Sequence, residues 1–133
     1  MAVKFANNAY STLSAGITDA ATSFDVASVD TFPTIGVSDH MYLSIVGSAY
    51  VEIVKVTGWS GTTLTVVRGR DGTTGTEADL GNRVELRVTT AMLTDAIADS
   101  NVDVFKTIEI SGQSDVVADS GTDTLTLVAS GGT

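Results

Sequence analysis

Hydrophobic and polar residues alternate along several stretches of residues 1–89, which is the period of a β-strand with one buried face. The clearest case is residues 82–89, where Val84, Leu86 and Val88 alternate with charged side chains. We expect these three side chains to point inward from a half-buried antiparallel strand. Further strands are predicted, from their β-branched and aromatic residues, at 23–27, 41–46, 50–57 and 63–68.

Two glycine-containing connections separate the later strands. Residues 58–62 predict a hairpin loop that carries Trp59, the only tryptophan, which would either fold back on the sheet or anchor an interface. Residues 69–81 contain four glycines and predict a long loop, which in a compact domain is usually functional or flexible. Within it, Asp71 and Gly72 predict a tight turn with unusual backbone angles.

A short helical stretch is predicted at residues 90–100, with Thr90 capping a helix over 91–98. Its apolar residues form a narrow stripe, and a helix of this length is not stable alone, so it must pack on the domain or on its own copies. The stripe consists of Met92, Leu93, Ala96 and Ile97.

Aspartates recur at a spacing of four residues along the same stretch, at Asp95, Asp99 and Asp103. A helix that continued so far would carry them as an acidic stripe. A solvated face is the favoured interpretation over a cation site shared by three parallel copies.

Residues 101–133 form an acidic, threonine-rich segment with strands predicted at 102–110 and 122–129. Isolated strands of this kind bury too little apolar surface for a core of their own, so we expect them to assemble with other copies. The predicted organisation is a β-domain at 1–90, a helix or linker at 91–100 and a strand segment at 101–133. The predicted assembly is a homotrimer.

The composition of the chain argues against several classes of function. The 133 residues carry 7 Lys and Arg against 16 Asp and Glu, a net charge of −9, which argues against nucleic-acid binding because phosphate contacts need clustered cations. Cysteine is absent, which excludes disulfides and thiolate metal sites. The sequence lacks a signal-peptide pattern and any run of 18 apolar residues, so we expect synthesis in a cytoplasm and no membrane partner.

Candidate catalytic residues are few. His40, the only histidine, lies next to Asp39, but neighbouring strand residues point to opposite faces and cannot form a base and its orienting acid. The spacing of Gly69, Gly72 and Gly75 fits neither phosphate-binding fingerprint. We therefore predict no enzyme activity, no cofactor and no metal site.

Several segments resemble one protein family. MAVKFANNAYSTLSAGI at 1–17, VEIVKVT at 51–57, LTVVRG at 64–69 and RVELRVT at 83–89 are similar to the N-terminal module of tail-fibre-like virion proteins of tailed phages, over about residues 1–98. ISGQSDVVADS at 110–120 and TDTLTLVA at 122–129 resemble the repetitive strands of fibre shafts in those proteins. The resemblance implies a homotrimeric fibre whose N-terminal module attaches to the virion.

These observations predict an all-β fold, a small antiparallel sandwich or barrel, followed by a short helix and a trimerising β-strand tail. The predicted function is that of a virion structural protein that docks a fibre on a phage tail or capsid. We expect the 69–81 loop on the side away from the shaft and Trp59 near the trimer axis. The predicted partner contacts are Arg70, Asp71, Gly72, Trp59, Val3 and Phe5.

Two alternatives remain open at this stage. A capsid decoration or cement trimer would suit an acidic, cysteine-free β-domain equally well. A carbohydrate-binding β-module is the other, with Trp59 and Tyr50 as stacking platforms.

Overall fold

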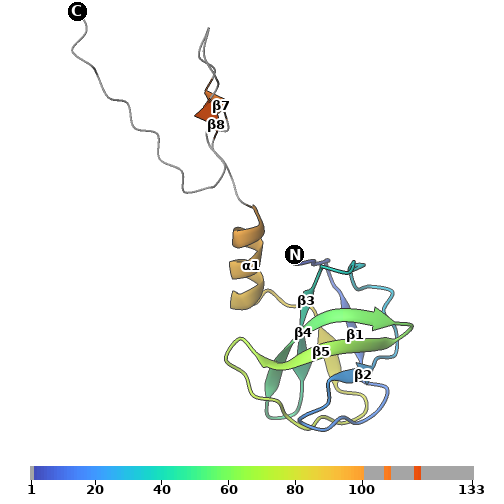
Figure 1. Cartoon of the computed structure of the whole chain (residues 1–133). Helices are drawn as coiled ribbons and strands as arrows, with labels where there is room; N and C mark the ends of the chain where they lie inside the picture. Colours follow the sequence, from blue (N-terminus) through green and yellow to red (C-terminus); the bar gives the residue numbers. More distant parts are fainter. Residues whose placement is uncertain (1, 101–106, 109–115, 118–133) are drawn as a thin grey trace, which may run out of the picture. The chain divides into compact units, whose positions relative to one another are not determined.

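The computed structural model describes residues 2–100, 107–108 and 116–117 (Figure 1). The chain divides into two compact units, residues 1–99 and 100–133. In the second unit, the described strands β7 (Thr107–Ile108) and β8 (Val116–Val117) form an antiparallel pair. The first unit contains β1 (Tyr10–Thr12), β2 (Ser23–Asp25), β3 (Met41–Val46), β4 (Val51–Ser60), β5 (Thr63–Arg70) and β6 (Arg83–Glu85), followed by α1 (Thr90–Ser100).

The strands of the first unit form one antiparallel sheet that curls around its core. The strand order is β1-β6-β3-β4-β5-β2. Just beyond the two edge strands, Leu13 and Val26 form an antiparallel bridge, and the Ala27 amide donates to the Thr12 carbonyl at 2.9 Å. The edges of the sheet therefore meet at one point, so the sheet curls into a half-barrel, which we call the barrel. The prediction of an all-β domain followed by a short helix is confirmed.

The barrel interior is filled by the inward side chains of successive strands. Full burial of such a side chain contributes roughly 1.5–3 kcal/mol relative to exposure. The pairing of β3 with β4 sets Leu43 opposite Val54 and Met41 opposite Val56, and all four are at most 1 % exposed. The remaining fully buried apolar side chains are Leu13, Val26, Ile45, Leu64 and Val84.

The predicted strand at 82–89 is too long. Val84 is fully buried as expected and Leu86 is partly buried, but β6 ends at Glu85 and Val88 is 75 % exposed. The N-terminal segment explains the difference, because Val3 pairs in parallel with His40 at the place beside β3 that a longer β6 would need. The chain leaves the sheet there and enters α1.

Trp59 is not in a hairpin loop, contrary to the prediction. Strand β4 continues through Trp59, which pairs with Leu64, and the turn is limited to Gly61 and Thr62. An irregularity in the pairing between Val56 and Gly58 shifts the phase of the strand. Trp59 is consequently partly buried and packs against the core.

Candidate functional site

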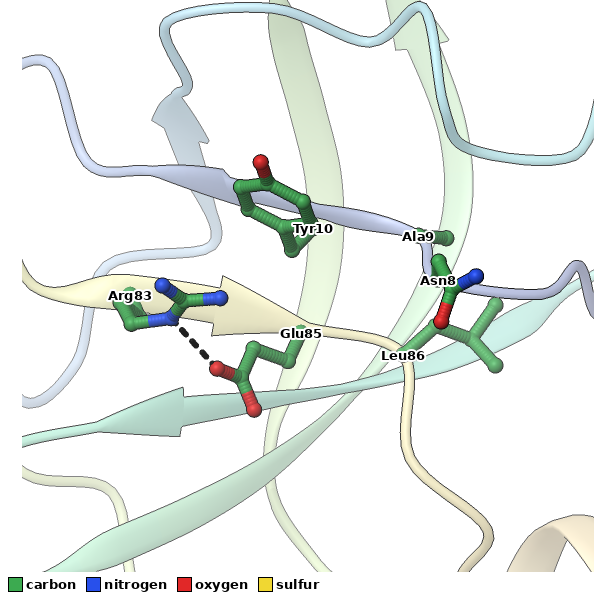
Figure 2. Close-up of a pocket in the computed structure, with 6 residues that line it drawn as sticks. All are labelled: Asn8, Ala9, Tyr10, Arg83, Glu85 and Leu86. Atoms are coloured by element: carbon green, nitrogen blue, oxygen red, sulfur yellow. Dashed lines mark hydrogen bonds and ion pairs between the residues drawn. The ribbon is translucent and has the colours of Figure 1, made fainter.

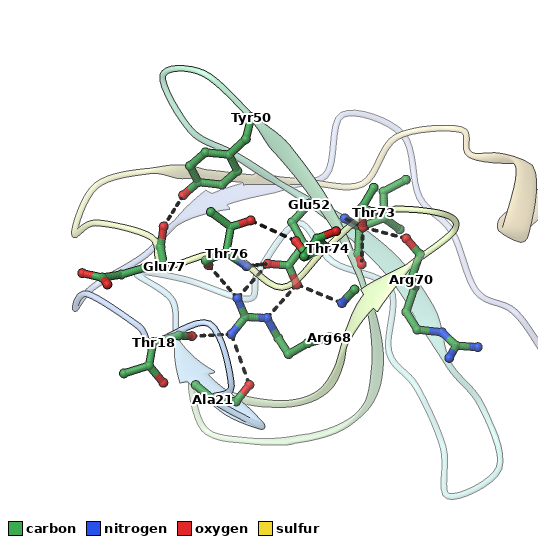
Figure 3. Close-up of polar contacts among 12 residues, drawn as sticks. Thr18, Ala21, Tyr50, Glu52, Arg68, Arg70, Thr73, Thr74, Thr76 and Glu77 are labelled. Carbon is green, nitrogen blue, oxygen red and sulfur yellow. Dashed lines mark hydrogen bonds and ion pairs between the residues drawn. The ribbon is translucent and has the colours of Figure 1, made fainter.

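The long loop between β5 and β6, residues 71–82, begins two residues later than predicted and is held by a buried ion pair. Glu52 on β4 is fully buried, and the Arg68 guanidinium from β5 binds its carboxylate with both Nε and Nη2 at 2.7 Å (Figure 3). Two parallel charge-assisted bonds of this kind are strong and fix the relative orientation of both groups. The pair thus joins β4 to β5 at the point where the loop begins.

The remaining hydrogen-bonding capacity of this ion pair is directed to backbone groups of β5, of the loop and of the segment before β2. The Glu52 carboxylate accepts from the amides of Gly69 at 3.0 Å and Thr76 at 2.9 Å. Arg68 donates to the carbonyls of Thr76 at 2.8 Å and Thr18 at 2.6 Å. Burial alone would raise the pKa of Glu52, but these hydrogen bonds outweigh it and lower the pKa. The loop is therefore anchored, and we call this arrangement of Glu52 and Arg68 the loop anchor.

Sequence reasoning missed the loop anchor, although a signal was present. Glu52 precedes Val54 and Val56 at the same alternating positions of the strand, so the pattern places a carboxylate on the inward face. A charge at such a position requires a charged, hydrogen-bonded partner. The identity of that partner, Arg68, depends on the pairing of β4 with β5.

The tip of the loop contacts the start of α1. Asp71 and Gly72 have positive φ angles of 53° and 79°, and the Thr73 amide donates to the Arg70 carbonyl at 3.0 Å, which confirms the predicted tight turn. The Asp71 carboxylate accepts from the Ala91 amide at 3.1 Å. The loop tip therefore lies on the helix side of the barrel. The segment predicted to form the shaft, residues 101–133, lies largely outside the described residues, so the position of the loop relative to the shaft stays a prediction.

Two residues outside α1 accept hydrogen bonds from the free backbone amides at its N-terminus. The hydroxyl of Thr89, not that of Thr90, accepts from the Met92 amide at 3.2 Å and serves as the N-cap. Asp71 satisfies a second amide and places a negative charge at the positive end of the helix dipole. The helix start is thereby fixed to the loop.

A second polar cluster fixes the middle of α1. The Asp95 carboxylate accepts from Nε2 of His40 and from the Tyr42 hydroxyl, both at 2.7 Å. The bond from Tyr42 lowers the pKa of Asp95 and the bond from His40 adds to this effect, while burial opposes both. Burial and the bond to Asp95 raise the pKa of Tyr42 to about 12. We call this cluster of His40, Tyr42 and Asp95 the helix anchor.

Apolar packing completes the attachment of the helix. Met92 is 4 % exposed and packs with Val3 and Tyr42 in a small cluster on the outer face of the sheet. Ile53 and Leu86 border the same cluster. One side of α1 is therefore seated on the barrel.

The helix anchor changes two interpretations made from the sequence. His40 is paired with Asp95, 55 residues further on, while the neighbouring Asp39 accepts from the Gly36 amide at 2.8 Å. Asp95 is directed to its own barrel, so it does not belong to a solvated acidic face. Asp103 lies outside the described residues. The cluster consists of a carboxylate, an imidazole and a phenol. Its hydrogen bonds join α1 to Tyr42 of β3 and to His40, which immediately precedes β3.

A side of α1 next to the one seated on the barrel exposes apolar residues. Leu93 is 51 % exposed and Ile97, four residues later, is 73 % exposed. Val88, which precedes the helix, is 75 % exposed. The sequence identified this helix as apolar but could not separate the residues that face the barrel from those that face outward.

The predicted partner contacts do not form one site. Arg70, Asp71 and Gly72 are exposed on one turn, where Asp71 is also bound to the helix. Phe5 is 60 % exposed. Val3 is buried beneath α1, and Trp59 packs on the barrel core.

Comparisons with known proteins assign no family. No family model matches the chain, and no curated protein matches it either. Within the described residues, α1 is too short to cross a membrane, and no other helix is found there.

Proposed function

We propose that the protein is a non-enzymatic structural protein of a phage virion. It would form the base of a trimeric fibre and dock that fibre to the tail or capsid. The observation that carries the proposal is the exposed apolar residues of α1: one side of the helix is fixed to the barrel, and an adjacent side exposes Leu93 and Ile97.

The argument for self-assembly rests on this helix. An isolated helix of 11 residues is only marginally stable, and the barrel stabilises one side of it. Leu93 and Ile97 are four positions apart, about one turn of the helix, and form a short apolar seam. Helices pack against copies of themselves through residues at this spacing. Three barrels that each present this seam would associate through α1, and the chain that follows would continue as a shared shaft.

A capsid decoration protein is the second candidate. It would use the same barrel and the same assembly, so its location on the particle distinguishes it from a fibre base. A carbohydrate-binding module has less support, because Tyr50 immediately precedes β4 whereas Trp59 lies near the other end of that strand. Tyr50 also donates its hydroxyl to the Glu77 carbonyl at 2.9 Å, and both rings pack on the core.

Electron microscopy of intact particles labelled with an antibody against the purified chain tests the proposal. Label at the base of fibres, on the tail or at a capsid vertex, supports the fibre assignment. Label spread over the capsid faces supports the decoration protein. Particles that carry no label while the chain is present in the infected cell would overturn the virion assignment.

A further inference from the structure

A surface on β1, β6 and the residues that follow β6 combines an exposed aromatic ring with two arginines. The Arg83 guanidinium carbon lies 4.7 Å from the centroid of the Tyr10 ring, within the range of a cation–π contact (Figure 2). Tyr10 is 51 % exposed, and the Arg83 side chain is 54 % exposed. A guanidinium stacked on a ring keeps its N–H edge available for a ligand.

One carboxylate is shared between two guanidiniums on this surface. Nε of Arg83 donates to one oxygen of Glu85, and Nε of Arg87 donates to the other at 2.7 Å. The bond from Arg87, followed by that from Arg83, lowers the pKa of Glu85, which therefore stays ionised and orients both arginines. Among the residues that the structure describes, the terminal Nη groups of these arginines have no acceptor. The cluster carries a surplus positive charge on a chain of net charge −9.

The surface is hollowed and its backbone is fixed. Asn8, Ala9 and Leu86 complete a hollow beside Tyr10, Arg83 and Glu85 (Figure 2). The Thr31 hydroxyl accepts from the Tyr10 amide at 3.1 Å and donates to the Tyr10 carbonyl at 3.0 Å. A preformed site of this kind loses little conformational entropy on binding.

We propose that this surface, formed by Tyr10, Arg83 and Arg87, binds an acidic protein segment of a neighbouring virion component. The terminal Nη groups of the two guanidiniums, which have no acceptor among the described residues, match carboxylates, and the hollow beside Tyr10 accepts an apolar side chain next to them. Tyrosine and arginine are the residues that most often dominate binding energy at protein interfaces. The identity of the partner as a virion component rests on the proposed function, whereas the acidic chemistry of the ligand rests on the surface itself.

Fluorescence anisotropy with the full-length protein tests the chemistry. The probe is a short labelled peptide of alternating Glu and Phe, and the control peptide has Gln in place of Glu. We expect the Glu peptide to bind about tenfold more tightly than the Gln peptide at low salt, and this preference to shrink at physiological salt. Equal binding of the two peptides, or no binding of either, would overturn the proposal.

Variants locate the binding to this surface. The double variant Arg83→Gln with Arg87→Gln should weaken binding of the Glu peptide by about tenfold or more, whereas Arg70→Gln, a change at an exposed arginine on another turn, should not. Arg83→Lys with Arg87→Lys keeps the charges and the fold but loses the forks, so it should also bind several-fold more weakly. An equal loss in Arg70→Gln would refute the location.

The oligomeric state of the same variants separates this inference from the proposed function. A double Arg→Gln variant that keeps its assembly but loses the peptide supports a separate partner surface. Loss of assembly together with loss of the peptide would show that the surface belongs to the contact between copies, which contradicts the inference. A wild-type chain that binds the peptide as a monomer would refute the trimer and leave the acidic ligand standing.

Discussion

The loop anchor and the helix anchor both centre on a carboxylate, but they lie in different surroundings. Glu52 is fully buried inside the barrel and pairs with a permanently charged arginine, whereas the Asp95 side chain is 33 % exposed on its outer face and accepts from an imidazole and a phenol. A buried ion pair that loses one partner leaves an uncompensated charge. A partly exposed hydrogen bond contributes less to the free energy of unfolding, because water can replace the lost partner.

This difference in surroundings gives the two anchors different roles: the loop anchor stabilises the barrel, and the helix anchor fixes the position of α1 on it. The loop anchor joins β4, β5 and the loop inside the barrel, so we expect its loss to destabilise the barrel itself. The helix anchor acts only between the finished barrel and α1. The attachment of the helix can therefore be altered without unfolding the barrel, which makes the comparison open to experiment.

Loss of the loop anchor should have the largest effect. Arg68→Ala leaves the Glu52 carboxylate buried without its counter-charge, and we expect the free energy of unfolding to fall by about 3–5 kcal/mol. Urea denaturation followed by circular dichroism measures this change. The matched control Arg70→Ala removes an exposed arginine two residues away and should change stability by less than about 0.5 kcal/mol. Similar losses in both variants would show that Glu52 does not depend on Arg68.

Loss of the helix anchor should act locally. Asp95→Ala leaves Nε2 of His40 and the Tyr42 hydroxyl without their acceptor, at a cost of about 1–3 kcal/mol. Hydrogen exchange should show faster exchange of the α1 amides and unchanged protection of β3 and β4. Thr94→Ala, a change at an exposed neighbouring position, serves as the control. Equal loss of protection in the barrel would contradict the separation of the two regions.

The helix anchor should also weaken at both extremes of pH. The pKa of Asp95 is lowered in the folded state, so its contribution is present above the unfolded pKa of about 4 and is lost as the pH falls through the folded value. The pKa of Tyr42 is raised to about 12, so its contribution is present below about 10 and is lost as the pH rises towards 12.

Exchange rates of the α1 amides measured relative to the barrel amides across this range test the pH prediction, because the ratio removes the intrinsic pH dependence of exchange. Tyr42→Phe should abolish the alkaline change and retain the acidic one. An alkaline change that persists in Tyr42→Phe would assign it to another group.

The contact between the loop tip and the helix should have the smallest effect. Asp71→Asn keeps an acceptor oxygen for the Ala91 amide but removes the charge at the helix N-terminus, which should cost about 0.3–1 kcal/mol at low salt and less at high salt. Thermal melts at two salt concentrations measure this difference. A loss that does not depend on salt would show that the charge of Asp71 is not what stabilises the helix.

The parts of the fold that follow local periodicity were predictable. Alternation identified Val84 as a core residue, and turn chemistry identified Asp71 and Gly72. Trp59 and Val88 were misplaced because a strand irregularity and a competing N-terminal segment override the local pattern.

The two anchors were not predictable to the same degree. An inward-facing Glu52 could have been recognised from its place in an alternating strand, although its partner could not. The pair of His40 and Asp95 spans 55 residues and has no local pattern, because it depends on where α1 lies on the barrel. Sequence patterns specify which faces are buried, while contacts between distant elements depend on the packing of the finished fold.

Sedimentation equilibrium of the full chain tests the central claim, assembly through the outward side of α1, most directly. We predict three times the 13.7-kDa mass of one chain at micromolar concentration. Leu93→Asp with Ile97→Asp should dissociate this assembly because it places charges in the seam, whereas Thr94→Asp, an exposed position on the same helix, should not. A monomeric wild-type chain, or a trimer that survives the double substitution, would contradict the account.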